Sequence, residues 1–188
     1  MTPKEFLTWE RDQPTERHVY FHGEVFAMSG DSPRHSALAS RVITQLGVGL
    51  AGKTCDVHTS DLRLGLDDAH FVYADAVVVC RPVVLRSGTT DVVTNPVIVV
   101  EVLSRSTESY DRGAKKAGYL ALASVAHLVL VSQRERRVEV YTREVNDATC
   151  SFRFRVHGAG TMAHLDRLGL TLAVNELYEG VFELPGDE

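Results

Sequence analysis

The clearest helical pattern lies in residues 32–52. Leucine or valine recurs at every fourth position from Leu38 onward, which predicts a helix with one apolar stripe. A serine–proline pair precedes this stripe and a glycine follows it, as at the starts and ends of many helices. The segment 2–12 shows a shorter pattern of the same kind, and a third helix is predicted over about residues 108–122.

Strand patterns fill most of the remaining chain. Loose alternation of apolar and polar residues around His22 and Gly23 predicts a hairpin over residues 18–29. Further strands are predicted over residues 55–66, 71–80, 95–104, 127–132, 137–143 and 150–156, and a last strand with a helical turn over 168–180. This mixed order of hairpin, helices and strands predicts an α/β fold in which helices flank a mixed β-sheet.

Composition is that of an ordinary globular protein. The 188 residues, of which 44% are hydrophobic, suit a single domain over residues 1–188. The formal net charge of −5 argues against a protein that coats nucleic acid without specificity, since such proteins carry a basic face. It does not exclude an enzyme that cuts nucleic acid, because a site built from carboxylates is acidic until a metal ion binds.

Cysteine usage and hydropathy predict a cytoplasmic location. Cys55, Cys80 and Cys150 are odd in number and widely spaced, so we expect reduced thiols rather than a disulfide or a zinc site. The N-terminal residues lack the apolar core of a signal peptide, and the longest apolar runs are too short to span a bilayer. No association with a membrane is expected.

One carboxylate interrupts the most apolar predicted strand. Glu101 lies between Val100 and Val102 in the run VIVVEVL, where an unpaired carboxylate would be costly to desolvate. A structural ion pair with lysine or arginine is the simpler explanation of such a residue, and a metal ion is the alternative.

Two further features of the sequence favour a metal ion over a structural ion pair. Asp75 is a second carboxylate among apolar residues, at the start of a strand expected beside that of Glu101. Two such groups repel each other unless a cation lies between them. The backbone carbonyl of Val102 would supply a third oxygen, and oxygen ligands suit Mg²⁺ or Mn²⁺.

The predicted helix after Glu101 adds a cation. Asp111, Lys115 and Tyr119 are spaced four residues apart and share one face, whereas Lys116 lies off it. If this helix packs on the sheet, Lys115 can point toward the two acids. A surface ion pair between Asp111 and Lys115 would explain the same spacing without any function.

Together these residues resemble the pattern of the PD-(D/E)xK nuclease superfamily and, within it, the Uma-two family of restriction endonucleases. The segment VIVVEVLSRSTESYDRGAKKAGY resembles the most specific block of that family. FHGEVFAMSGDSPRHS resembles its opening hairpin and helix start, and TSDLRL and YADAVVVC resemble its middle strands. HLVLVSQRERRVEVYTR resembles the strand pair that follows, so the likeness covers nearly the whole chain.

The resemblance implies a restriction-endonuclease-like core with a metal-dependent site. Asp75 and Glu101 would be metal-binding acids, Lys115 the catalytic lysine and Glu24 an additional acid. The superfamily often places its lysine two residues after the glutamate. That position is Leu103 here, so the lysine would come from the helix instead.

Two positions depart from the family pattern. Ala74 stands where the superfamily motif has proline, and Arg105 stands where the family tends to have proline after the serine. Neither change removes a ligand, so an intact site is expected. Arg105 would reach a phosphate or only solvate its loop.

The predicted activity is metal-dependent hydrolysis of phosphodiester bonds in nucleic acid, with DNA as the expected substrate. Asp75, Glu101 and the Val102 carbonyl would hold the ion, Lys115 would position the attacking water, and Glu24 would bind a second ion or orient a water. A homodimer is expected, because cutting two strands favours twofold symmetry. The alternatives are a non-catalytic nucleic-acid-binding or assembly module on the same fold, and a hydrolase of small phosphoesters.

Several further residues admit both a functional and a structural role. His35 would touch substrate, orient Glu24 or serve as a structural hydrogen-bond donor. His18 and His22 would share a strand face, which hints at a metal but lacks a third ligand. Asp61 would orient a metal ligand or occupy a turn. A basic turn would contact phosphate or form a solvated hairpin tip; it comprises Arg134, Arg136 and Arg137.

Overall fold

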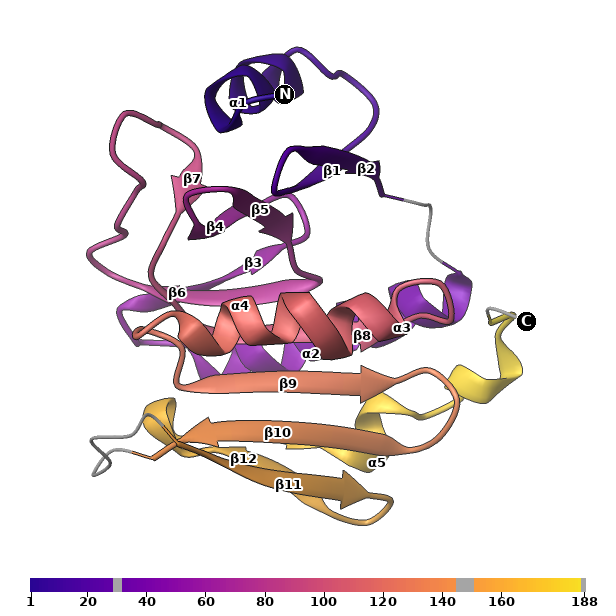
Figure 1. Cartoon of the computed structure of the whole chain (residues 1–188). Helices are drawn as coiled ribbons and strands as arrows, with labels where there is room; N and C mark the ends of the chain where they lie inside the picture. The colour runs from indigo at the N-terminus through magenta and orange to yellow at the C-terminus, as the bar shows by residue number, and fades with distance from the viewer. Residues whose placement is uncertain (29–31, 145–150, 187–188) are drawn as a thin grey trace.

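Two β-sheets form the centre of the molecule. The computed structural model describes residues 1–28, 32–144 and 151–186. A six-stranded sheet has the order β11-β10-β9-β8-β6-β3, and a five-stranded sheet has the order β2-β1-β5-β4-β7 (Figure 1). The first consists of β3 (Cys55–Thr59), β6 (Ala76–Cys80), β8 (Pro96–Leu103), β9 (His127–Ser132), β10 (Arg137–Arg143) and β11 (Phe152–Gly158). The second consists of β1 (His18–Phe21), β2 (Glu24–Ala27), β4 (Arg63–Asp67), β5 (His70–Tyr73) and β7 (Val92–Val93).

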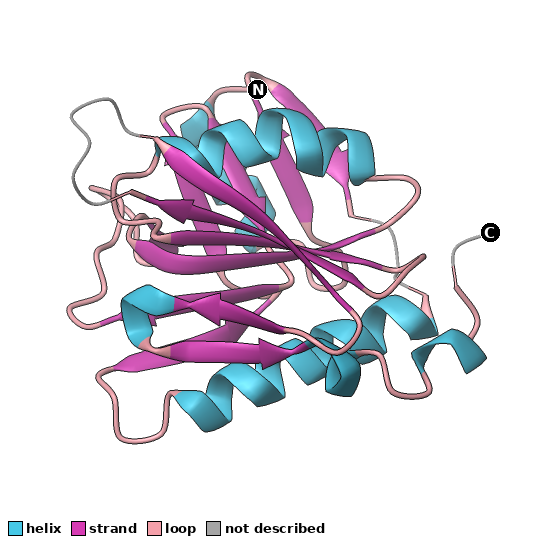
Figure 2. Ribbon diagram, turned by 90° about the horizontal axis from the view of Figure 1, so that it is seen from below, coloured by secondary structure: helices cyan, strands magenta, loops and turns pink. Residues whose placement is uncertain are grey.

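Helices cover both faces of the six-stranded sheet. One face packs on α2 (Pro33–Gly49), and the other packs on α4 (Lys116–Ala121), as Figure 2 shows. Strands β8 and β9 are parallel and the remaining pairs of this sheet are antiparallel, so the predicted α/β fold with a mixed sheet is confirmed. The other elements are α1 (Pro3–Arg11), β12 (Met162–Leu165), β13 (Leu170–Ala173), α5 (Val174–Leu177) and 3-10 turns at Asp166–Leu168 and Val181–Glu183. None of the helices in the described residues combines the length and hydropathy that a membrane span requires.

Strand β8 shows how the sequence positions its carboxylate. Val100 and Val102 pack in the core beneath α2, whereas Val99 and Leu103 pack in the core beneath α4. Side chains of a strand alternate between its two faces, so Glu101 points to the α4 side. The acid therefore lies in the middle of the sheet and faces the helix that carries the predicted lysine.

Helix α2 forms where the apolar stripe predicted it. The side chain of Ser32 accepts a hydrogen bond from the His35 amide at the first turn, and a proline occupies the start. The stripe residues from Leu38 to Leu46 are fully buried against the six-stranded sheet. Capping and amphipathicity therefore agree, and the first turn of this helix carries His35 toward the sheet.

Two predicted strands are each divided between the two sheets, which corrects the sequence prediction. Residues 55–66 form β3 in the six-stranded sheet and β4 in the five-stranded sheet. Residues 71–80 likewise form β5 and then β6, separated by Ala74 and Asp75. Apolar alternation continues on both sides of each break, so the pattern did not reveal the change of sheet. The second crossing places Asp75 at the junction of the two sheets.

The helix predicted over residues 108–122 is interrupted. It consists of α3 (Glu108–Tyr110), a π-helical segment (Asp111–Lys115) and α4, with non-helical torsion angles at Gly113. A π-helical turn often marks a functional site. Lys115 is the last residue of this π-helical segment.

The prediction of reduced thiols is wrong for two of the three cysteines. Cys55 and Cys80 lie opposite each other in the antiparallel pairing of β3 with β6 and form a disulfide. The strand register brings together two cysteines that are 25 residues apart in sequence. Cys150 lies outside the described residues, as does Ser29, the last residue of the predicted hairpin.

Candidate active site

Glu101 is buried and holds two hydrogen-bond donors. Its Oε1 atom accepts from the Tyr119 hydroxyl at 2.6 Å and lies 2.8 Å from the Lys115 ammonium nitrogen. All three side chains are at least nine-tenths buried. The ammonium group compensates the charge that made this acid costly in a strand.

Lys115 lies between two carboxylates. Its Nζ atom is 3.4 Å from Oδ1 of Asp111, one turn earlier on the same face. The other oxygen of Asp111, Oδ2, accepts a hydrogen bond of 2.5 Å from the Thr107 hydroxyl. Thr107 and Asp111 therefore fix the helix face from which Lys115 reaches Glu101.

Asp75 is held by the adjacent strand and by α2. Its Oδ2 atom accepts a hydrogen bond of 2.6 Å from the Val102 amide and lies 3.3 Å from Nε2 of His35. Val102 thus contacts Asp75 through its N–H group. Sequence reasoning offered His35 as a partner of Glu24, and the structure places it against Asp75 instead.

The acids of this cluster shift one another's pKa values. Burial raises the pKa of Glu101 to about 8; the Lys115 ammonium opposes this shift, and the charges of Asp75 and Asp111 add to it. Burial lowers the pKa of Lys115, but the carboxylates of Glu101, Asp111 and Asp75 outweigh burial and raise it above its usual value. Burial also raises the pKa of Tyr119. Three carboxyl groups thus share one ammonium group in a poorly hydrated site.

A cavity of about 580 Å³ connects these groups. The predicted site residues that line it are Glu24, His35, Asp75, Glu101, Val102, Asp111 and Lys115. Tyr119 lies behind Glu101 and does not line it, and Arg105 is exposed outside it. The fold therefore brings seven of the nine predicted residues to one cavity.

The chemistry of the cavity fits a divalent cation in part. Among the described residues no group of three or more histidine, cysteine, aspartate and glutamate side chains is placed to hold a metal ion. The candidate ligands are two carboxylates, Asp75 and Glu101, with the Val102 carbonyl as a third oxygen. Within the described part of the chain, Asp75 makes its contacts through Oδ2 and Glu101 through Oε1, so Oδ1 and Oε2 can serve a ligand. Hard oxygen donors and surplus negative charge suit Mg²⁺ or Mn²⁺.

The remaining candidates lie away from the cavity. His18 is held by Glu10 at 2.9 Å, and His22 lies in the hairpin turn; within the described residues, neither belongs to a group of three side chains that could hold a metal ion. Asp61 pairs with Arg17 at 3.6 Å, beside a second, smaller cavity.

The basic turn between β9 and β10 is engaged within the protein. Arg137 contacts Glu139 at 2.8 Å, Arg134 lies 3.8 Å from Glu108, and the Arg136 guanidinium stacks over the Phe182 ring. These contacts favour a structural role for the turn over contact with a phosphate.

Sequence reasoning missed the other side of the cavity. This side is apolar and aromatic, and it is formed by the β1–β2 hairpin together with α3. Its residues are Val19, Phe21, Phe26, Ala27, Met28 and Tyr110. Alternate positions of both hairpin strands contribute. That alternation was visible in the sequence, but nothing in the chain showed which element the apolar face would meet.

The chain is similar to known proteins along nearly its whole length. A model of the Uma2 family, described as "Putative restriction endonuclease", matches residues 3–175. The uncharacterized protein slr1290 of Synechocystis is 33% identical over 182 residues, which cover 96% of this chain and 93% of that protein. A second protein of Synechocystis, sll1609, is 27% identical over 144 residues, 76% of this chain and 81% of that protein.

A solved structure shares the fold. The crystal structure of a "putative nuclease belonging to DUF820" from Anabaena variabilis superimposes with a TM-score of 0.78. The match covers 96% of this chain and 99% of the other, at 16% sequence identity. At this identity the likeness concerns the fold.

Proposed function

Since the chain belongs to the Uma2 family, described as "Putative restriction endonuclease", we propose that it is a metal-dependent endonuclease that hydrolyses phosphodiester bonds of DNA. One observation carries the proposal: Asp75 and Glu101 line the same cavity, and Lys115 approaches Glu101 to 2.8 Å. The fold shared with the solved structure titled "putative nuclease" supports it. Residues 1–188 form one nuclease domain in this proposal.

The acids would provide the metal site. Asp75, Glu101 and the Val102 carbonyl would hold Mg²⁺ or Mn²⁺, which when bound supplies Lewis acidity to a phosphoryl oxygen and to water. The Lys115 ammonium donates a hydrogen bond to the attacking water and offsets the negative charge that develops on the phosphate oxygens. As the water oxygen bonds to phosphorus and releases a proton to solvent, the bond to the ester oxygen breaks and that oxygen takes up a proton from solvent.

Four further residues support this chemistry in the proposal. His35 fixes the orientation of Asp75, Tyr119 fixes Glu101, and Asp111 fixes Lys115. Glu24 is exposed where the hairpin borders the cavity, so it can orient a water or bind a second ion. Each of the four thus holds a reacting group or a water without forming a bond to phosphorus.

The quaternary state and the location extend the proposal. A homodimer would place two such sites on opposite strands of a substrate, because twofold symmetry matches antiparallel strands. The cytoplasmic location stays a prediction. One of its arguments, the reduced thiols, is lost with the disulfide between Cys55 and Cys80.

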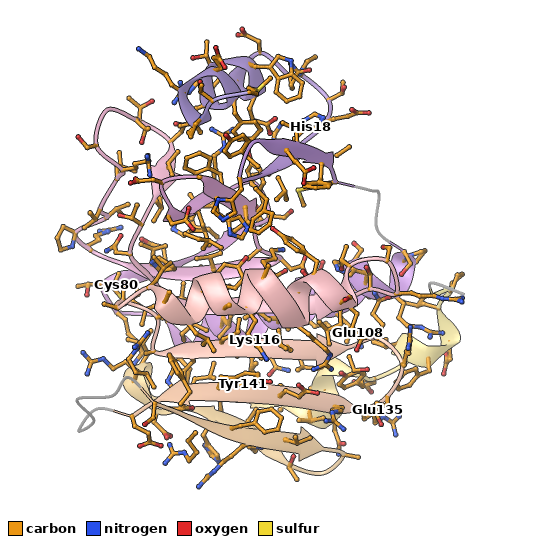
Figure 3. All side chains as sticks on the ribbon, viewed as in Figure 1. His18, Cys80, Glu108, Lys116, Glu135 and Tyr141 are labelled. Carbon is orange, nitrogen blue, oxygen red and sulfur yellow. A yellow bond between two sulfur atoms is a disulfide. The ribbon has the colours of Figure 1, made fainter. Side chains whose placement is uncertain are left out.

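Two neighbouring lysines provide a matched test. Lys115→Ala should reduce nicking of a supercoiled plasmid in Mg²⁺ by about 100-fold or more, because the positive charge at the reacting phosphate is lost. Lys116→Ala should nick at the wild-type rate, since Lys116 lies over the Tyr141 ring at 5.2 Å, outside the cavity (Figure 3). EDTA should abolish nicking by all three proteins.

Asp75→Asn tests the metal ligand in the same assay. It should lose both nicking and the Mg²⁺-dependent rise in melting temperature, while its circular dichroism spectrum shows a folded protein. Wild-type nicking by Asp75→Asn or by Lys115→Ala would refute the assignment. A wild-type protein that binds DNA without cutting it would favour a binding module on the nuclease fold.

A further inference from the structure

The apolar side of the cavity comes from one face of the hairpin. Val19 pairs with Phe26, and Phe21 pairs with Glu24, across β1 and β2. Side chains at paired positions share a face, and alternate positions on each strand share it too. Val19, Phe21 and Phe26 therefore face the cavity together, next to Met28.

The other face of the hairpin already has a core partner. Tyr20 stacks on Phe6 of α1 with ring centroids 4.9 Å apart, and its hydroxyl donates to the Met1 carbonyl at 2.8 Å. The hairpin is thus anchored from behind. Yet Phe26 and Met28, which both line the cavity, are 50% and 37% exposed. Anchoring of the hairpin does not account for these exposed apolar side chains.

The aromatic groups deeper in the cavity are held in place. The Phe21 ring meets the His70 ring edge to face at 4.7 Å and the Tyr110 ring at 6.4 Å. The Tyr110 hydroxyl and His70 Nε2 form a hydrogen bond of 2.6 Å. A rigid aromatic surface binds a planar ligand with little loss of conformational entropy.

The charges of the cavity do not suit a duplex backbone. Among the described residues that line it, Lys115 is the one lysine or arginine, and it is paired with Glu101. Glu24, Asp75 and Asp111 add further acidic groups to the lining. Duplex binding proteins obtain most of their affinity from cations on phosphates, so a substrate here needs another source of binding energy.

We propose that this apolar wall, defined by Val19, Phe21, Phe26 and Met28, is a subsite for an unpaired nucleobase. The inference rests on the proposed nuclease function and specifies its substrate as single-stranded or locally unpaired DNA. A base stacked on the wall would bring its own phosphate toward Asp75, Glu101 and Lys115. The cavity of about 580 Å³ lies within the range of small-ligand sites, which suits one nucleotide.

Two exposed phenylalanines allow a matched binding test. Wild type, Phe26→Ala, Phe26→Trp and Phe154→Ala are compared for binding a fluorescein-labelled 12-nucleotide DNA, as a single strand and as a blunt duplex, by fluorescence anisotropy. Ca²⁺ replaces Mg²⁺, and gels of the same samples record any cleavage. Phe154 is 48% exposed on β11, the far edge of the six-stranded sheet, so it matches Phe26 in type and exposure.

Wild type should bind the single strand more tightly than the duplex. Phe26→Ala should weaken single-strand binding about fivefold or more, because stacking of one base contributes at least that factor. Phe26→Trp should restore the affinity, and Phe154→Ala should leave it unchanged. Quenching of 2-aminopurine fluorescence in the single strand should likewise be strong with wild type, Phe26→Trp and Phe154→Ala, and weak with Phe26→Ala.

Each other outcome is decisive. Equal or tighter binding of the duplex, an equal effect of Phe26→Ala and Phe154→Ala, or no binding of either DNA would overturn the base subsite. Plasmid nicking that continues in Phe26→Ala would then leave the nuclease proposal standing. If the wild type binds the single strand more tightly than the duplex, Phe26→Ala weakens that binding, and no DNA is cut, the result would support the subsite and reject the nuclease proposal.

Discussion

At the scale of single residues, the buried pair of Glu101 and Lys115 is costly for stability, whatever chemistry it serves in the proposed function. Both side chains are buried, and their contact of 2.8 Å compensates part of a large desolvation cost. Apolar or neutral groups of similar volume often replace a buried ion pair without loss of stability, whereas removal of one partner is costly. The site therefore keeps charges that the core does not need.

This cost can be measured by urea unfolding in EDTA. Lys115→Met should lower the free energy of unfolding by about 3 kcal/mol, because Glu101 and Asp111 lose their buried counter-charge. Combining it with Glu101→Gln should bring stability back to within about 1 kcal/mol of wild type, since the amide oxygen still accepts from Tyr119. Equal stabilities of the single and double variants would contradict this account.

The residues also show how far the sequence could lead. The four-residue spacing of Asp111, Lys115 and Tyr119 predicted that they share one helix face, which would meet Glu101 if the helix packed on the sheet. The hydrogen bond from the Val102 amide to Asp75 depends on the register between two strands, as does the disulfide. Period-two patterns do not determine register between distant strands, so neither contact was predictable.

At the scale of elements, a glycine sets the distance between α4 and the five-stranded sheet. A Cβ atom added to Gly118 would lie 2.6 Å from Cδ1 and 3.3 Å from Cβ of Leu66 on β4. Leu66 is buried, so it has little room to move. Lys115 lies at the N-terminal end of α4, so we expect a displacement of this helix to move Lys115 relative to Glu101.

Gly118→Ala should therefore destabilise the protein by about 1–3 kcal/mol, since overpacking outweighs the gain in helix propensity. It should also reduce plasmid nicking, because Lys115 is displaced. Gly47→Ala in α2 is the control: its added Cβ would make an ordinary contact of 3.6 Å with Val57, so stability should hold or rise. Thermal unfolding of the two variants distinguishes these effects. A Gly118→Ala protein as stable as Gly47→Ala would show that α4 can move away from β4.

Elements were predicted best where local signals agreed. Helix α2 has a cap, a start and a stripe, and the hairpin of β9 and β10 has two clear strands around a polar turn. The divided strands were predicted as continuous, because alternation is the same on both sides of a break. Tertiary packing decided which half joins which sheet, and it moved Asp75 from a strand to the junction between sheets.

At the scale of the whole molecule, titration of buried groups couples stability to pH in opposite directions. Burial lowers the pKa of His127 and of His70 to about 4. Between pH 6.5 and 4 the unfolded chain therefore binds more protons than the folded chain, and the free energy of unfolding decreases as the pH decreases. The raised pKa of Glu101 acts oppositely: stability rises as pH falls from about 8 toward 4.5. The total slope therefore mixes both effects, and a variant is needed to separate them.

His127→Gln separates them. His127 Nε2 accepts a hydrogen bond from the Arg167 amide at 3.1 Å, which requires the neutral ring, and a glutamine oxygen can take its place. The stability of His127→Gln, measured by urea unfolding, should fall less than that of wild type between pH 7 and pH 4.5, because one buried group no longer gains a proton on unfolding. His164→Gln, at an exposed position on β12, should follow the wild-type curve. If His127→Gln and wild type lost the same amount of stability between pH 7 and pH 4.5, protonation of His127 would not contribute to the loss. Other groups, such as His70, would then have to account for it.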